Sequence, residues 1–158
     1  MYTDSDYAGD KETRISVMGY ILFFMGVPII WKLKSQKSVT LSSLEAEYVA
    51  LSEAAKDIKF IYQLLGRIGI QVKLPIVVRN NNVGAIFMSE NALTSGHTKH
   101  LDIRYRFVNE TVIEGFLKIV FVKTKENVAD IITKNVTSKT YRNLVPKFPS
   151  DHSLLNEN

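Results

Sequence analysis

The stretch ISVMGYILFFMGVPIIWKL, residues 15–33, determines how the fold begins. Ile15 to Met25 is rich in β-branched and aromatic residues, which favour β-strands. Gly26-Val27-Pro28 marks a turn, and Ile29 to Leu33 then resumes the composition of a strand. The stretch therefore predicts a β-hairpin. A shorter strand fragment, Tyr2-Thr3-Asp4, precedes it across a loop of glycine and charged residues.

Downstream of the hairpin the hydrophobic residues recur every three or four positions, which is the period of an amphipathic helix. The repeat predicts a helix that ends at Gly66 or Gly69, and it is carried by Leu44, Tyr48, Leu51, Ala55, Ile58, Tyr62 and Leu65. The same reasoning predicts a strand over 76–78, a short helix over 83–87, a helix over 102–114 with Ile103, Phe107 and Val112 toward the core, a strand over 117–122 and a helix over 128–134. An antiparallel start followed by alternating helices and strands indicates an α/β fold, with a mixed sheet and helices packed on its faces.

The composition is that of one globular domain. The chain has 158 residues, of which 46% are hydrophobic, and this suffices for a single core. The sequence shows no run of about twenty apolar residues and no signal peptide, so we expect an intracellular protein without a membrane span. There are no cysteines and three histidines, so a metal would be held by oxygen atoms, which favours Mg²⁺ or Mn²⁺.

The basic residues gather in two clusters. The net charge of +4 and the isoelectric point near 9.2 suit a polyanionic partner. The first cluster comprises Lys32, Lys34 and Lys37, and the second comprises Lys99, His100, Arg104 and Arg106. Two such patches predict a surface that follows the phosphate backbone of a nucleic acid, with a solvated lysine-rich face as the alternative.

Three carboxylates fall at predicted element boundaries. Asp4 ends the first strand, Glu47 lies in the first turn of the long helix, and Asp130 lies in the first turn of the last helix. If they converge on one side of the sheet, they would repel one another unless divalent cations neutralised them, and two metals about 4 Å apart drive phosphodiester cleavage. Two alternatives stay open: Asp4 could start a turn, and Asp130 could belong to a helix start capped by Asn127.

Glu45 and Glu47 can be assigned different roles. Ser42 and Glu45 have the S-x-x-E spacing of a capping box, so Glu45 has a structural role at the start of the helix. Glu47 has no such role and falls beside the apolar stripe, where a lone carboxylate is costly unless a cation faces it. Glu47 is therefore the better functional candidate.

Five short segments stand out in order along the chain: YTDSDYAGD (2–10), SSLEAEYVA (42–50), NVGAI (82–86), TKHLDIRY (98–105) and NVADIITK (127–134). Together they resemble the signature blocks of ribonuclease H domains of copia-type retrotransposon Pol polyproteins. The resemblance implies a ribonuclease H-like α/β fold over residues 1–136, a five-stranded mixed sheet whose first three strands are antiparallel, with helices on both faces. We expect a short helix and a disordered tail in 137–158.

The resemblance also implies hydrolysis of the RNA strand of RNA-DNA hybrids with two Mg²⁺ or Mn²⁺ ions and no protein nucleophile. The acids that hold the metals would fall at Asp4, Glu47, position 81 and Asp130. The implied partners are the hybrid and the reverse transcriptase and integrase parts of the same polyprotein, for a monomeric domain without membrane contact. The residues expected to contact the hybrid are Lys32, Lys34, Lys37, Ser43, Asn82, Lys99, His100 and Arg104.

Position 81 departs from the family pattern because Asn81 stands where an aspartate is usual. Asparagine keeps a carbonyl oxygen but loses a negative charge, so we expect cleavage to fall at least a hundredfold, equivalent to roughly 3 kcal/mol of barrier. The alternatives are a nucleic-acid-binding pseudo-nuclease that no longer cuts and a decayed retrotransposon fragment.

Overall fold

The computed structural model describes residues 1–9, 12–36, 40–91 and 99–147. Five strands form one mixed sheet in the order β3-β2-β1-β4-β5. Their bounds are Tyr2–Asp6 (β1), Val17–Phe24 (β2), Val27–Ser35 (β3), Ile76–Asn80 (β4) and Leu117–Phe121 (β5). β1, β2 and β3 are antiparallel, whereas β4 runs parallel to both β1 and β5. This topology confirms the predicted sheet.

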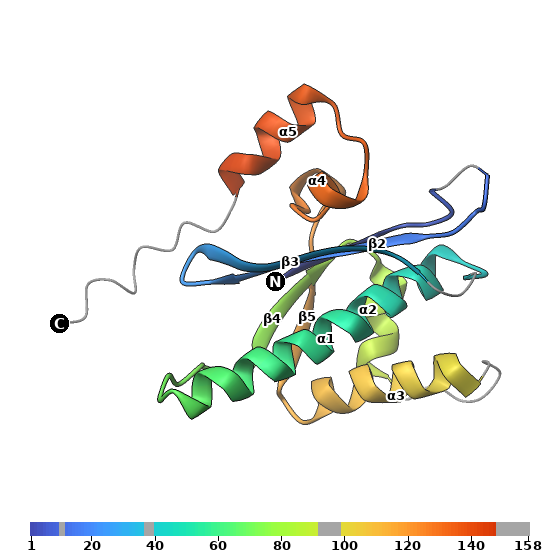
Figure 1. Cartoon of the computed structure of the whole chain (residues 1–158). Coiled ribbons are helices and arrows are strands. Elements are labelled where there is room, and N and C mark those ends of the chain that lie inside the picture. The colour runs from blue at the N-terminus through green and yellow to red at the C-terminus, as the bar shows by residue number, and fades with distance from the viewer. Residues whose placement is uncertain (10–11, 37–39, 92–98, 148–158) are drawn as a thin grey trace.

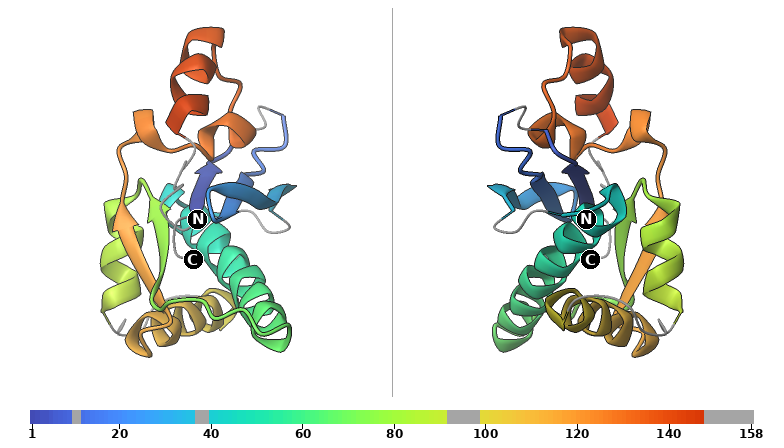
Figure 2. Two further views of the ribbon diagram at one scale, coloured as in Figure 1. Left: turned by 90° about the vertical axis from the view of Figure 1, so that its left-hand side faces the viewer. Right: turned by 90° about the vertical axis from the view of Figure 1, so that its right-hand side faces the viewer.

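The helices cover both faces of the sheet, as Figure 1 shows. Helices α1, α2 and α3 lie on one face, and α4 and α5 lie on the other. Their bounds are Ser43–Arg67 (α1), Val83–Glu90 (α2), Lys99–Ile113 (α3), Asp130–Thr133 (α4) and Ser138–Leu144 (α5). The side views of Figure 2 show that α5 lies farther from the sheet than α4, and that β4 and β5 are steeply inclined to β2 and β3. The tail predicted beyond α5 falls on residues 148–158, outside the described part.

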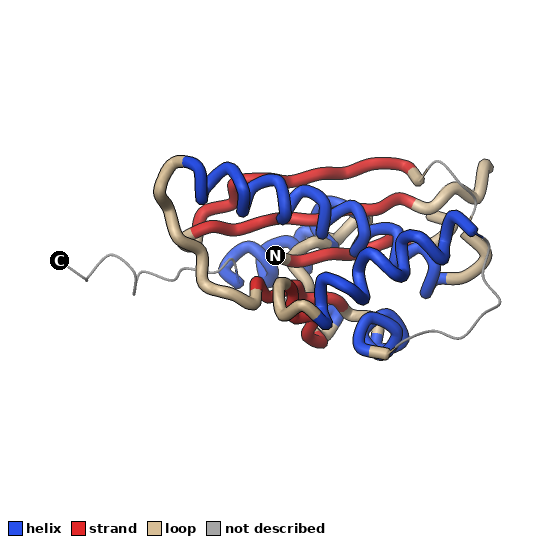
Figure 3. The backbone as a smooth tube through the Cα atoms, turned by 90° about the horizontal axis from the view of Figure 1, so that it is seen from below, coloured by secondary structure: helices blue, strands red, loops and turns tan. Residues whose placement is uncertain are grey.

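The main core lies between the sheet and α1. Helix α1 runs along the strands with α3 beside it (Figure 3), and Tyr20, Tyr48, Ile58 and Val108 are almost fully buried there. The prediction that Ile103 faces the core is wrong, because its side chain is 65% exposed. Within the described part of the chain, no helix is both long and apolar enough for a membrane span.

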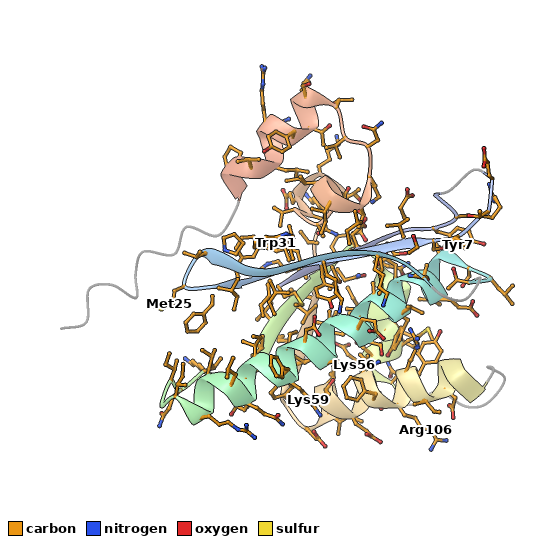
Figure 4. All side chains as sticks on the ribbon, in the orientation of Figure 1. Tyr7, Met25, Trp31, Lys56, Lys59 and Arg106 are labelled. Carbon is orange, nitrogen blue, oxygen red and sulfur yellow. The ribbon has the colours of Figure 1, made fainter. Side chains whose placement is uncertain are left out.

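The hairpin turn lies one residue earlier than predicted. Met25 and Gly26 both have positive φ, 51° and 78°, which is the backbone of the tight turns that match strand twist. Val27 and Pro28 therefore belong to β3. A proline is tolerated there because β3 is an edge strand. Trp31 projects from β3 on the side of the sheet away from α1 (Figure 4) and is 68% exposed.

Candidate active site

The candidate site lies where β1 and β4 diverge. The two strands pair at Tyr2, where β1 starts, and Arg79, near the end of β4. Beyond that point, side chains from other elements take the place of the backbone ladder. The Ser5 N–H donates to Glu47 Oε1 at 3.2 Å, and the Thr3 carbonyl accepts from an asparagine amide at 2.8 Å. Because buried backbone groups require partners, these contacts stabilise the open end of the sheet.

Glu47 is directed into this opening by the start of α1. Ser42 Oγ accepts the N–H of Glu45 at 3.1 Å, and the Glu45 carboxylate accepts the N–H of Leu41 at 2.6 Å, which confirms the capping role of Glu45. Glu47 is free of that role and is 5% exposed. Asn80 Nδ2 donates to Glu47 Oε2 at 2.9 Å, so both carboxylate oxygens of Glu47 are hydrogen-bonded.

Asp4 and Asp130 meet at one ammonium group. Asp4 is completely buried in β1, and the hydroxyl of Thr133 donates to its Oδ2. Lys134 Nζ lies 3.0 Å from Asp4 Oδ1 and 3.1 Å from Asp130 Oδ1. These two distances place the two carboxylate oxygens no more than about 6 Å apart. The side chain of Asp130 thus faces Asp4, and its helix begins without a side-chain cap.

Asn81 is presented to Asp4 from the end of β4. Its Nδ2 lies 3.4 Å from Asp4 Oδ1. The preceding residue, Asn80, is fully buried, donates to Thr3 Oγ1 at 3.0 Å and accepts the N–H of Asn82 at 2.8 Å. These hydrogen bonds fix the backbone at the end of β4, and the side chain at position 81 is therefore held beside Asp4.

Burial and the charge of Asp4 raise the pKa of the two carboxylates beside it, Glu47 and Asp130. Burial, then the charge of Asp4, raises the pKa of Glu47 to about 8 against the opposing hydrogen bond from Asn80. The same two causes raise the pKa of Asp130 to about 6, against the attraction of Lys134. Burial lowers the pKa of Lys134, but the two aspartates outweigh it and the net shift is upward. The cluster therefore favours a positive charge between its acids.

The donor atoms suit a hard cation, although the three predicted ligands do not surround one point. Among the described residues, no group of three or more acidic, histidine or cysteine side chains is arranged to hold a metal ion. Glu47 faces Ser5 and Asn80, whereas Asp4 and Asp130 face Lys134. Two of the three acids thus converge on one cation position, and carboxylate oxygens there fit Mg²⁺ or Mn²⁺. The full metal cluster stays a prediction.

Comparisons with known proteins agree with this architecture. No protein-family model matches the chain. Over 146 residues the chain is 36% identical to the retrovirus-related Pol polyprotein from transposon RE1 of Arabidopsis thaliana, and over 135 residues it is 41% identical to that from transposon TNT 1-94 of Nicotiana tabacum. These matches cover 92% and 85% of the chain.

Solved structures show the same fold. The chain superimposes on the LC11 ribonuclease H1 isolated from compost, and on that enzyme in complex with an RNA/DNA hybrid, with TM-scores of 0.61 and 0.62 at 17% identity. The superpositions cover 89% of this chain and 95% and 96% of the others. The chain belongs to the ribonuclease H-like domains of copia-type Pol polyproteins. It spans 10% of the length of the polyproteins that it matches.

Three of the expected hybrid contacts in this copia-type domain lie around α1 and β3. Lys32 pairs with Asp57 at 3.5 Å, and Arg104 lies 4.0 Å from Glu53. Lys34 and Arg104 share the lining of one surface recess. The acids that accompany Lys32 and Arg104 reduce the positive charge available to a phosphate.

The other expected contacts are divided between the site and undescribed parts of the chain. Ser43 is the first residue of α1, and Asn82 caps α2 by accepting the N–H of a later residue at 3.0 Å. Lys37 lies outside the described residues, as do the side chains of Lys99 and His100. All of these contacts stay predictions.

Several residues of the site were missed by reasoning from the sequence. Asn80 and Asn127 each tie β1 to another element, and Thr133 and Lys134 bind Asp4 directly. The available signal was the spacing of Asp130 and Lys134, four residues apart, which places both on one face of a helix. Nothing in the sequence shows that the same lysine also reaches Asp4.

Proposed function

We propose that this domain is a divalent-metal-dependent ribonuclease for the RNA strand of RNA-DNA hybrids, weakened by Asn81. The supporting observation is that Asp4, Asp130 and Asn81 meet at the open end of the sheet. The fold shared with ribonuclease H1 agrees with this activity but does not establish it. In its polyprotein, the domain would work beside the reverse transcriptase and integrase parts.

The acids of the site would hold the metal. Asp4 and Asp130 would hold Mg²⁺ or Mn²⁺ between them, and Glu47 would join after leaving Ser5 and Asn80. When bound, the ions of a two-metal site activate a water molecule and stabilise the leaving oxygen. Thr133 orients the Asp4 carboxylate by donating to one oxygen, which leaves the other oxygen for the cation.

Asn81 accounts for the expected loss of rate. Its amide nitrogen is on the side of Asp4 in the structure, and turning the amide by half a rotation would present its oxygen instead. A neutral oxygen binds a divalent cation more weakly than a carboxylate does. We therefore expect Mg²⁺-supported cleavage to be at least about a hundredfold slower than with aspartate at this position.

The test compares the wild-type domain with Asn81→Asp on one labelled RNA-DNA hybrid, in Mg²⁺ and in Mn²⁺. We expect hybrid-specific cleavage by Asn81→Asp, slow cleavage by the wild type, and no cleavage when Asp4→Asn is added to Asn81→Asp. Duplexes of RNA alone and of DNA alone serve as substrate controls. Absence of cleavage by both wild type and Asn81→Asp, with either metal, would refute the ribonuclease proposal.

A second candidate function is binding of hybrid without cleavage. It is favoured by the Lys134 ammonium between Asp4 and Asp130, which already neutralises part of the site. In that case hybrid affinity should fall with salt along a log-log slope of several phosphate contacts, while Asn81→Asp still fails to cut. Salt-independent affinity would exclude this candidate.

A further inference from the structure

We propose that Lys134 is a built-in counter-ion that occupies the cation position between Asp4 and Asp130, so that a divalent metal binds only when this ammonium leaves. The inference rests on the proposed metal-dependent function and adds a residue that controls its metal affinity. Lys134 is a positioning residue in this account, because it acts through the two carboxylates.

The geometry of Lys134 supports competition with a metal. Its Nζ lies 3.0 Å from Asp4 Oδ1 and 3.1 Å from Asp130 Oδ1, so one cation contacts both acids. Asp4 is completely buried, so bulk water cannot solvate its negative charge, and a cation is needed beside it. A metal ion that used the same two oxygens would overlap the ammonium group.

Lys134 also has room to leave. Its side chain is 31% exposed, and its flexible four-carbon stem allows the ammonium to move into water. The backbone at Lys134 has turned out of α4 into an extended conformation, while its N–H still donates to the carbonyl of Asp130 at 3.1 Å. The side chain can therefore exchange positions without unfolding α4.

Asn81 shifts the competition between a divalent cation and Lys134 toward the lysine. With asparagine at position 81, the acids that touch Lys134 carry two negative charges, and one ammonium cancels half of that charge. An aspartate at position 81 would add a third charge within reach of Asp4, and a divalent cation would then gain more than a monovalent one. The wild-type site therefore favours the lysine ammonium over a divalent cation.

The experiment measures Mn²⁺ binding by calorimetry and the thermal midpoint, with and without Mn²⁺, by circular dichroism. The proteins are wild type, Asn81→Asp, Lys134→Gln, Lys134→Arg and Lys139→Gln. Lys139 is exposed on α5, so its substitution makes the same change of net charge away from the site. We expect Lys134→Gln to have a lower midpoint than wild type without metal and at least about tenfold tighter Mn²⁺ binding, with Lys139→Gln unchanged.

Lys134→Arg keeps the test informative if Lys134→Gln does not fold. A guanidinium can bind both carboxylates through several N–H groups, so this variant should retain the metal-free midpoint and bind Mn²⁺ more weakly than wild type. Equal Mn²⁺ affinity in wild type, Lys134→Gln and Lys134→Arg would overturn the counter-ion role and leave the metal site intact. No Mn²⁺ binding by any variant, Asn81→Asp included, would overturn the metal-dependent function itself.

Discussion

Two buried carboxylates, Glu47 and Asp130, make the stability of the metal-free domain depend on pH. Burial and the charge of Asp4 raise the pKa of Glu47 from its ordinary 4.5 to about 8, and the pKa of Asp130 from 3.8 to about 6. The folded chain therefore keeps protons that the unfolded chain has already released. By linkage, the stability that these protons contribute is complete below about pH 4 and is lost as the pH rises through 6 and 8.

We predict that Glu47 contributes a falling free energy of unfolding between pH 6 and 8, and that Glu47→Gln removes this contribution, so that its slope is more positive than that of the wild type. The buried amine of Met1, with its pKa lowered to about 5, contributes the opposite slope in both proteins. Glutamine removes the titration while keeping one oxygen for the Ser5 N–H. Urea unfolding at a series of pH values measures the slope. Glu114→Gln, at an exposed position, is the control for net charge. An unchanged slope in Glu47→Gln would show that Glu47 is ionised throughout this range.

At the scale of elements, the four-residue helix α4 depends on a glycine in β2. A Cβ atom at Gly19 would lie 2.5 Å from Cγ2 of Thr133 and 3.1 Å from Cδ1 of Ile132. Thr133 cannot simply turn away, because its hydroxyl group is bound to Asp4 and to the carbonyl of Ala129. The absence of a side chain at position 19 thus lets α4 approach the sheet closely enough to place Asp130 and Lys134.

We predict that Gly19→Ala destabilises the domain by about 1–3 kcal/mol, which is typical of overpacking, and displaces Thr133 from Asp4. Chemical denaturation measures the stability, and the amide signals of residues 130–134 report the displacement by NMR. The matched control is Gly66→Ala in α1, where a Cβ meets no atom within 4 Å and the higher helix propensity of alanine should add up to about 1 kcal/mol. Equal stability of the two variants would contradict the packing argument.

At the scale of the whole molecule, the sequence predicts the architecture better than the details of the site. The hairpin, the long helix and the order of the remaining elements follow from composition and period, and the family resemblance adds the number of strands and the antiparallel direction of the first three. The side of α3 that faces the core could not be predicted in this way. Apolar residues lie on several sides of this helix, at Ile103, Tyr105, Phe107 and Val108. Only the packing against α1 shows that Tyr105 and Val108 are inside and Ile103 is outside.

The sequence indicates which residues form the site but not how their side chains are directed. The places of Asp4, Glu47 and Asp130 at element boundaries make them candidates, and the family resemblance adds Asn81. The structure brings Asp4, Asn81 and Asp130 together. The direction of Glu47 toward Ser5 depends on the divergence of β1 from β4, which is a property of the assembled sheet. Long-range contacts of this kind leave no local pattern in the sequence.

The most direct test of the central claim is a crystal structure of Asn81→Asp grown with Mn²⁺ and measured at a wavelength where manganese scatters anomalously. The account predicts an anomalous peak between the carboxylates of Asp4 and Asp130, with the ammonium of Lys134 displaced toward solvent. A crystal at saturating Mn²⁺ with Lys134 still bound to both aspartates, and no anomalous peak between them, would contradict it.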